Sequence, residues 1–170
     1  MTSTNTGKNL PGPLAGVRVL ELTGEHAQFC GKLMADLGAD VIKIEPPGGQ
    51  ETRKVGPFLK DEEHPERSLY FWHYNTSKRG VTLDITLPEG QEVFKKLAAT
   101  ATLILESFPA GYLPSIGLGY EALSENNPGL IMCSVTPFGQ DGPWRDYKTT
   151  DLLHLAAGGQ MASSGYDVED

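Results

Sequence analysis

The sequence has few of the features that mark metal-binding or membrane proteins. Its two cysteines, Cys30 and Cys133, have no CxxC spacing and no histidine cluster around them, so they do not indicate a zinc site. We expect two buried thiols in a reducing cytosol. No apolar run approaches the roughly 20 residues of a membrane span, and residues 1–10 lack the apolar stretch of a secretory signal. We therefore expect a cytoplasmic protein that has no membrane partner.

An excess of basic residues is also missing. The formal net charge is -8 and the sequence pI is about 5.0. Broad nucleic-acid binding requires a basic face, so nucleic acid is not an expected partner. A small anionic ligand remains compatible with this charge, because a few local cations or a helix N-terminus can hold one. With 39% hydrophobic and 21% charged residues, the 170-residue chain is expected to be globular and to form one domain with a sizeable core.

Strand and helix patterns alternate along the chain. Short apolar runs predict strands at residues 17–22, 40–44, 81–85, 103–105 and 130–135. Helical patterns lie at residues 25–37, 86–99, 121–126 and 150–157. In the first of these helices, the apolar residues with helical spacing are Phe29, Leu33, Met34 and Leu37. The alternation predicts an α/β fold with a mostly parallel, doubly wound sheet.

The two ends of the chain differ from this pattern. Residues 1–12 are polar at first and are expected to form a disordered lead-in to a domain that occupies residues 13–170. Residues 163–170 form a polar run without a closing helix or strand. We therefore expect the sheet to be incomplete at the C-terminus.

Ligands of open α/β sheets bind beyond the carboxyl ends of the strands, which here means residues 23–28, 46–53, 106–111 and 136–148. No dinucleotide, P-loop, zinc-protease or serine-hydrolase motif occurs in them. His26 in the first loop is either a solvated histidine or a ligand contact. The pair Lys78 and Arg79 is either a solvated basic pair or an anion contact. Lys148 is a lone lysine between a loop and a helix, and by itself it does not indicate a function.

Several segments together resemble the N-terminal part of family III CoA-transferases, the formyl-CoA and carnitine-CoA transferase type. The resemblance covers residues 13–159. Its longest segments are LAGVRVLELT at 14–23, LMADLGADVIKIEPPGG at 33–49 and NTSKRGVTLD at 75–84. The shorter ones are PEG at 88–90, ESF at 106–108, LGY at 118–120, NP at 127–128 and SVTPFG at 134–139. Their order and spacing, more than any single segment, carry the resemblance.

The resemblance implies a Rossmann-like domain that binds CoA or acyl-CoA, followed in the family by a smaller second domain that this sequence does not include. It implies an interlocked homodimer and an enzyme that passes CoA from an acyl-CoA to a carboxylic acid acceptor. In such enzymes an aspartate attacks the thioester and later carries CoA as an aspartyl-CoA thioester, which is nucleophilic catalysis. No metal is implied.

Residue by residue, the resemblance assigns CoA contacts at seven positions. Those in the loop after the first strand are His26 and Ala27. Ser107 and Phe108 match a pair that flanks the cofactor, and Lys148 matches a lysine that contacts CoA in some members. The remaining two positions are Leu83, which matches a CoA-lining position, and Thr86, which stands where some members have a cation.

No catalytic residue is assigned within the chain. The family's aspartate is expected about 30 residues after Thr150, beyond the last residue, while Asp167 and Asp170 come too early. We therefore expect this fragment to be inactive. Two alternatives stay open: a racemase or isomerase of the same superfamily, and a non-catalytic module that binds CoA or a partner chain. The racemases carry a His-Asp pair where this chain has Thr150 and Asp151, and threonine cannot move an α-proton.

Overall fold

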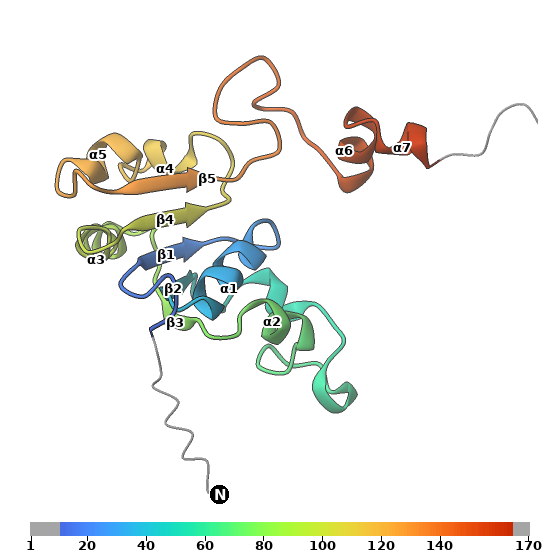
Figure 1. The fold of residues 1–170 in the computed structure, drawn as a ribbon, viewed down its shortest axis with the longest axis horizontal. Helices are drawn as coiled ribbons and strands as arrows, with labels where there is room; N and C mark the ends of the chain where they lie inside the picture. Colours follow the sequence, from blue (N-terminus) through green and yellow to red (C-terminus); the bar gives the residue numbers. More distant parts are fainter. Residues whose placement is uncertain (1–10, 165–170) are drawn as a thin grey trace, which may run out of the picture.

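A five-stranded parallel sheet forms the centre of the computed structural model, which describes residues 11–164 (Figure 1). The strands are β1 (Arg18–Leu22), β2 (Asp40–Glu45), β3 (Arg79–Thr82), β4 (Leu103–Glu106) and β5 (Ile131–Ser134). Their order in the sheet is β3-β2-β1-β4-β5, and all neighbours pair in parallel. After β3 the chain crosses to the other side of β1, where β4 and then β5 are added, so the direction of strand addition reverses between β1 and β4. This order confirms the predicted doubly wound, Rossmann-like α/β class.

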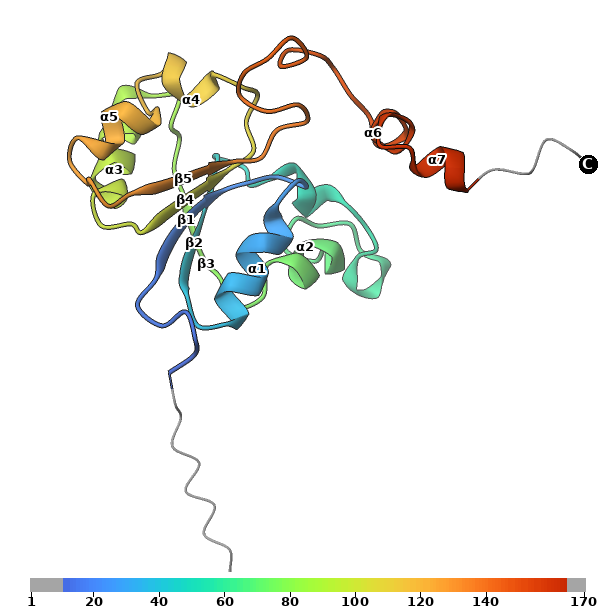
Figure 2. The ribbon, with the colours of Figure 1, turned by 45° about the horizontal axis from the view of Figure 1, so that its top comes forward.

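Helices cover both faces of the sheet (Figure 2). One face carries α1 (Gln28–Asp36) and α2 (Leu69–Tyr74), and the other carries α3 (Pro88–Ala98), α4 (Tyr112–Ser115) and α5 (Tyr120–Ser124). The segment between β2 and α2 contains two 3-10 turns, η1 (Glu51–Lys54) and η2 (Leu59–Asp61). Two short helices, α6 (Asp151–Ala157) and α7 (Gln160–Ser163), extend away from the sheet after the loop that follows β5.

Two apolar clusters lie on opposite faces of the sheet. The larger one joins the sheet to α3, α4 and α5, and Leu20, Phe94, Ile104 and Leu118 in it are completely buried. The smaller one joins the sheet to α1 and is built around Val19, Val41, Ala35 and Leu105. Because neighbouring residues of a strand point to opposite faces, Ile104 and Leu105 belong to different clusters.

The first helix is where it was predicted, but its largest apolar side chains do not face the sheet. Phe29, Leu33 and Leu37 are each about half exposed (48%, 47% and 48%), and Met34 is partly buried. The residues that α1 buries are small or polar: Gln28, Gly31 and Ala35. Small residues let the helix backbone approach the sheet closely, and this approach leaves the apolar face of α1 open to solvent.

Other expectations need correction. The third strand covers residues 79–82 and not 81–85, because parallel pairing with β2 starts at Arg79 and the chain leaves the sheet at Leu83. Both cysteines are exposed rather than buried. Cys133 lies on the edge strand β5, whose neighbouring Ile131 is 57% exposed. The short helices α4 and α7 were not predicted. Residues 1–10 of the predicted lead-in, together with Asp167 and Asp170, lie outside the described residues.

Candidate functional site at the carboxyl edge of the sheet

The loops after β1 and β4 meet where the strand order reverses. The backbone N–H of Gly24, directly after β1, donates to Oγ of Ser107, directly after β4, at 3.1 Å. Glu106 ends β4 with a buried carboxylate, and its Oε2 accepts from the N–H of Phe108 at 2.7 Å. These bonds fix the start of the second loop against the first. In doubly wound sheets this switch point is the usual place for a ligand.

A hollow of about 570 Å³ opens beside this switch point. Four of the seven predicted contact residues line it: His26 from the loop after β1, Ser107 and Phe108 from the loop after β4, and Lys148 from the loop after β5. The three loops that carry these side chains are separated in sequence by at least 40 residues, and parallel pairing of their strands brings them to one edge of the sheet. The hollow therefore combines an aromatic ring, a hydroxyl, an imidazole and an ammonium group.

A second, smaller hollow of about 160 Å³ lies on the other side of Phe108. The predicted contacts Leu83 and Thr86 line it together with Phe108 itself. Gln50 and Tyr112 complete its wall, and the ring of Tyr112 packs against that of Phe108 with 4.8 Å between centroids. Phe108 is thus common to both hollows. The side chain of Thr86 donates to Oδ1 of Asp84 at 2.6 Å, and its N–H bonds to the same atom.

Ala27 is placed differently from the other six predicted residues. It packs against the smaller apolar cluster beneath α1 and is not among the residues that line either hollow. It precedes α1 with a φ of 68°, in the left-handed region that a residue with a Cβ seldom adopts. The position therefore shapes the turn between β1 and α1.

A third hollow of about 400 Å³ separates His26 from the start of α6. It is lined by Thr136, Thr150, Asp151 and His154 among others. Thr150 is the N-cap of α6, and its side chain accepts a hydrogen bond from the N–H of Leu153 at 3.4 Å. The chain has Thr150 at the position expected for the histidine of the racemases, and the hydroxyl of Thr150 caps a helix.

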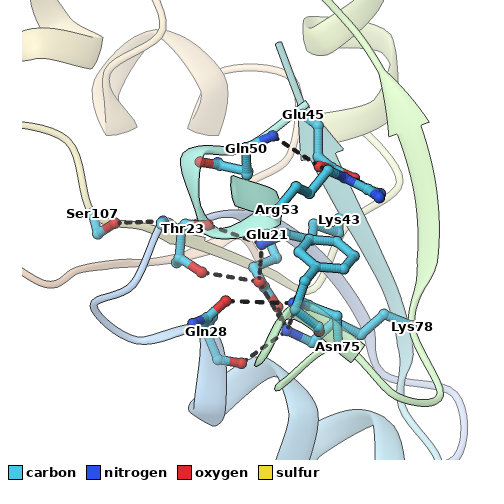
Figure 3. Close-up of polar contacts among 12 residues, drawn as sticks. Glu21, Thr23, Gln28, Lys43, Glu45, Gln50, Arg53, Asn75, Lys78 and Ser107 are labelled. Atoms are coloured by element: carbon cyan, nitrogen blue, oxygen red, sulfur yellow. Dashed lines mark hydrogen bonds and ion pairs between the residues drawn. The ribbon is translucent and has the colours of Figure 1, made fainter. Parts of the chain in front are cut away.

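A buried ionic cluster lies beneath the loop after β1 (Figure 3). Glu21 is completely buried on β1, and its carboxylate binds two lysines, Lys43 of β2 and Lys78 from the segment before β3. The side chains of both lysines are only 2% exposed. Burial lowers the pKa of Lys78 to about 8, although the neighbouring Glu21 carboxylate opposes this shift. The sequence had left Lys78 and Arg79 as an equivalent pair, whereas the structure buries Lys78 and leaves Arg79 exposed against Asp40.

A second buried pair anchors the segment after β2. Glu45 ends β2, and Arg53 of η1 binds it with two hydrogen bonds of 2.6 and 2.8 Å. The guanidinium also lies 3.8 Å from the ring centroid of Phe71 on α2, a cation–π contact. Burial raises the pKa of Glu45, but the hydrogen bonds from Arg53 and from the N–H of Gln50 outweigh burial and lower it. The pair thus connects β2, η1 and α2 near the second hollow.

Sequence reasoning missed these two clusters. Glu21 and Lys43 occur within otherwise apolar strand segments, LEL and IKI, and a charge in a buried strand is a signal that it has a partner. The partners of these charges are remote in sequence. Glu21 and Lys78 are 57 residues apart, so nothing in the local pattern predicts their contact.

The described residues contain neither a metal centre nor a membrane helix. Between residues 11 and 164, no group of three or more His, Cys, Asp or Glu side chains converges as metal ligands would. Within the same part of the chain, no helix has the length and the apolar character needed to cross a membrane.

Fold and edge together define a Rossmann-like α/β domain with a candidate ligand site at its switch point. The chain matches the family described as CoA-transferase family III over residues 14–169, and it belongs to this family.

Similar proteins agree with this assignment. The chain is 42% identical over 150 residues to succinyl-CoA:(R)-benzylsuccinate CoA-transferase subunit BbsE of Thauera aromatica. The aligned region covers 88% of this chain and 37% of that protein. It is 40% identical over 161 residues to succinate–glutarate CoA-transferase of Agrobacterium fabrum, covering 92% of this chain and 40% of that protein. The chain therefore spans about 40% of the length of these curated relatives.

Solved structures have the same fold. A CaiB/BaiF family protein from Brucella suis superposes with a TM-score of 0.80 at 39% identity, over 88% of this chain and 40% of that one. Rv3272 from Mycobacterium tuberculosis superposes with a TM-score of 0.81 at 34% identity, over 95% of this chain and 44% of that one. These matches confirm both the fold class and the predicted family resemblance.

Proposed function

We propose that this chain is the CoA-binding N-terminal region of an enzyme that moves CoA from an acyl-CoA to a carboxylic acid. One observation carries the proposal. Three loops that are remote in sequence gather His26, Ser107, Phe108 and Lys148 around a single hollow at the switch point of the sheet. This observation agrees with family membership, which independently assigns CoA-dependent chemistry to relatives of the chain.

The two hollows beside Phe108 suit different parts of CoA. Lys148 is exposed and charged, so it attracts a phosphate group in the larger hollow. The smaller hollow has apolar walls from Leu83 and Phe108 and polar groups from Gln50 and Thr86. Such a combination suits a flat heteroaromatic base, which needs stacking surface and a few hydrogen-bond partners.

In the proposed reaction, an aspartate carboxylate attacks the thioester carbonyl, and CoA thiolate leaves as a mixed anhydride forms. The thiolate then attacks the aspartyl carbonyl of the anhydride, which gives aspartyl-CoA thioester and releases the donor acid. The acceptor acid takes over the CoA by the reverse sequence. We assign no residue of this chain to the aspartate role, and we expect the 170-residue chain to bind CoA without transferring it.

We extend the proposal to the acyl-CoA donor, to the oligomeric state and to the cellular location of the complete enzyme. Several relatives are named as succinyl-CoA-dependent CoA-transferases, so succinyl-CoA is the first donor to test.

We propose that the complete enzyme is a cytoplasmic homodimer. The exposed apolar side chains of Phe29, Leu33 and Ile131 support assembly, because apolar surface of this kind is usually covered by a partner. Sedimentation of the complete enzyme at increasing concentration tests the homodimer, and a monomer at every concentration would contradict it.

Calorimetric titration with CoA tests the central claim. Phe108→Ala removes the ring shared by both hollows, and Lys148→Met removes the cation of the larger one. Each is expected to weaken CoA binding about tenfold. Lys96→Met, an exposed lysine on α3, is the matched control and should bind like the unmodified chain. Failure of the unmodified chain to bind CoA would reject the proposal.

An assay of CoA transfer from succinyl-CoA to other carboxylates tests the second part. Transfer by the 170-residue chain alone would reject the expectation that the nucleophile lies elsewhere. The racemase alternative is not favoured, because Thr150 has no ionisable group near neutral pH and serves as a helix cap. Exchange of an α-proton of a 2-methylacyl-CoA for deuterium, catalysed by the chain, would revive it.

A further inference from the structure

We propose that Lys78 is a positioning residue that holds the loop of residues 23–28 in the shape that receives CoA. The inference rests on the proposed function, because this loop carries His26 to the edge of the larger hollow. Lys78 itself lines neither of the two hollows beside Phe108. It therefore acts through the loop.

The ammonium group of Lys78 has three donor protons and three partners, which Figure 3 shows. It donates to the backbone oxygen of Gln28 at 2.8 Å, to Oδ1 of Asn75 at 2.9 Å and to Oε1 of Glu21 at 2.9 Å. Gln28 is the first residue of α1 and is 1% exposed. Lys78 thus ties the end of the loop to β1 and to the end of α2.

The other end of the loop is held by the same carboxylate. Lys43 donates to Oε1 of Glu21 and to the backbone oxygen of Thr23, both at 2.9 Å, and Oγ1 of Thr23 donates to the same Oε1. Between the two held ends, Ala27 has its left-handed backbone. A strained turn persists only where its surroundings determine it, and here the two lysines determine both of its ends.

The charges of the cluster argue against a role in stability alone. Lys43 and Lys78 both pair with the single carboxylate of Glu21, so the fully ionised cluster carries one excess positive charge in a buried place. Titratable groups face Lys78 from three elements: the Glu21 carboxylate of β1, the Lys43 ammonium of β2 and the neutral Cys30 thiol of α1, whose pKa is raised by burial. Removing the charge of Lys78 leaves Glu21 and Lys43 as a neutral pair. A second buried lysine beside one carboxylate costs folding free energy. What Lys78 contributes in return is the position of the loop, which it holds through its hydrogen bond to the backbone oxygen of Gln28.

Lys78→Met in the 170-residue chain is the test, with Arg79→Met as the matched control that removes the adjacent exposed cation. In Lys78→Met, amide hydrogen exchange of residues 24–28 should become about tenfold faster and CoA binding about tenfold weaker, while the urea midpoint at pH 7 should not fall, because removal of the buried charge offsets the lost hydrogen bonds. Arg79→Met should leave the exchange of this loop and the affinity unchanged. Lys78→Gln, whose side chain is one bond shorter and uncharged, serves as the second variant if the first does not fold.

The outcomes separate this inference from the proposed function. A lower urea midpoint with unchanged loop exchange and unchanged CoA affinity would make Lys78 a structural residue and overturn the inference. If the unmodified chain does not bind CoA, the proposed function fails, and amide hydrogen exchange of residues 24–28 alone decides whether Lys78 positions the loop. Faster exchange at residues 24–28 in the variants would then still support the positioning role, and unchanged exchange would overturn it.

Discussion

The carboxylate of Glu21 occupies the space beside the backbone of Gly31, where any larger residue would need to place its Cβ. A Cβ built on Gly31 overlaps Oε2 of Glu21 and comes within 3.3 Å of the Nζ of Lys78. Helix α1 can therefore lie this close to β1 only because its contact residue is glycine. The same approach keeps Glu21 between its two lysines.

Gly31→Ala should destabilise the chain by about 2 kcal/mol or more, because the added methyl group overpacks the site and displaces a buried, paired carboxylate. The midpoint of urea unfolding measures this change. Gly129→Ala is the control, since the nearest atom to its Cβ would be 3.9 Å away, and it should change the free energy of unfolding by less than about 0.5 kcal/mol. Equal effects of the two substitutions would contradict the overlap.

Lys78 should make the free energy of unfolding rise with pH in the alkaline range. Its pKa is about 8 in the folded chain, because of burial, while an unfolded lysine titrates near 10.4. Between about pH 8 and about pH 10 the unfolded chain therefore binds more protons, and stability rises by at most about 3 kcal/mol. Below pH 8 both states are protonated, and the cost of the buried charge is fully present.

Urea unfolding of the unmodified chain and of Lys78→Met across this range isolates the effect. The other lysines and the tyrosines titrate in both proteins, so their effects cancel in the difference between the two free energies of unfolding. This difference should therefore change with pH because of Lys78 alone. A constant difference would show that Lys78 keeps its proton in the folded chain.

Arg53→Lys should cost about 2 kcal/mol, because lysine can replace neither the two hydrogen bonds to Glu45 nor the flat contact with Phe71. Thermal or urea unfolding measures this loss. Lys54→Met is the control: its pair with Glu51 is exposed and is worth less than about 1 kcal/mol.

The same pair predicts an acid dependence. The folded pKa of Glu45 lies below its ordinary value, so its contribution is present above about pH 4.3 and is lost as the pH falls through the folded pKa. The difference between the unmodified chain and Arg53→Lys should shrink in this acid range. A difference that stays constant would indicate that packing against Phe71, and not the ion pair, accounts for the loss.

Ser68→Ala should destabilise more than Thr150→Ala, although both remove a helix N-cap. Ser68 is completely buried, accepts from the N–H of Phe71 at 3.0 Å and donates to the backbone oxygen of Val55 at 2.5 Å. Its loss leaves both backbone groups unpaired and should cost about 2 kcal/mol. Thr150 is exposed with a single long bond, so its loss should cost about 0.5 kcal/mol. Reversal of this order in urea unfolding would contradict the assignment.

Most of the fold was predictable because its strands and helices are encoded locally. Short apolar strand segments and proline at the first position of α3 are local signals, and four of the five strands lie within about one or two residues of their predicted ranges. The third strand was misplaced since its bounds depend on pairing with β2, and α1 was placed correctly while its buried face was not. The spacing of apolar residues predicts a helix, but it does not determine which face of that helix packs against the sheet.

The sequence by itself determined the α/β class, the family and the loops in which a ligand site should lie. Only the tertiary structure decided which residues share that site. Parallel pairing brings Ser107, Phe108 and Lys148 beside His26, and it directs Ala27 toward the core. It also decided that Lys78 is buried and that Arg79 is exposed. The physical reason is that burial and charge pairing depend on contacts between residues far apart in the chain, which no local pattern specifies.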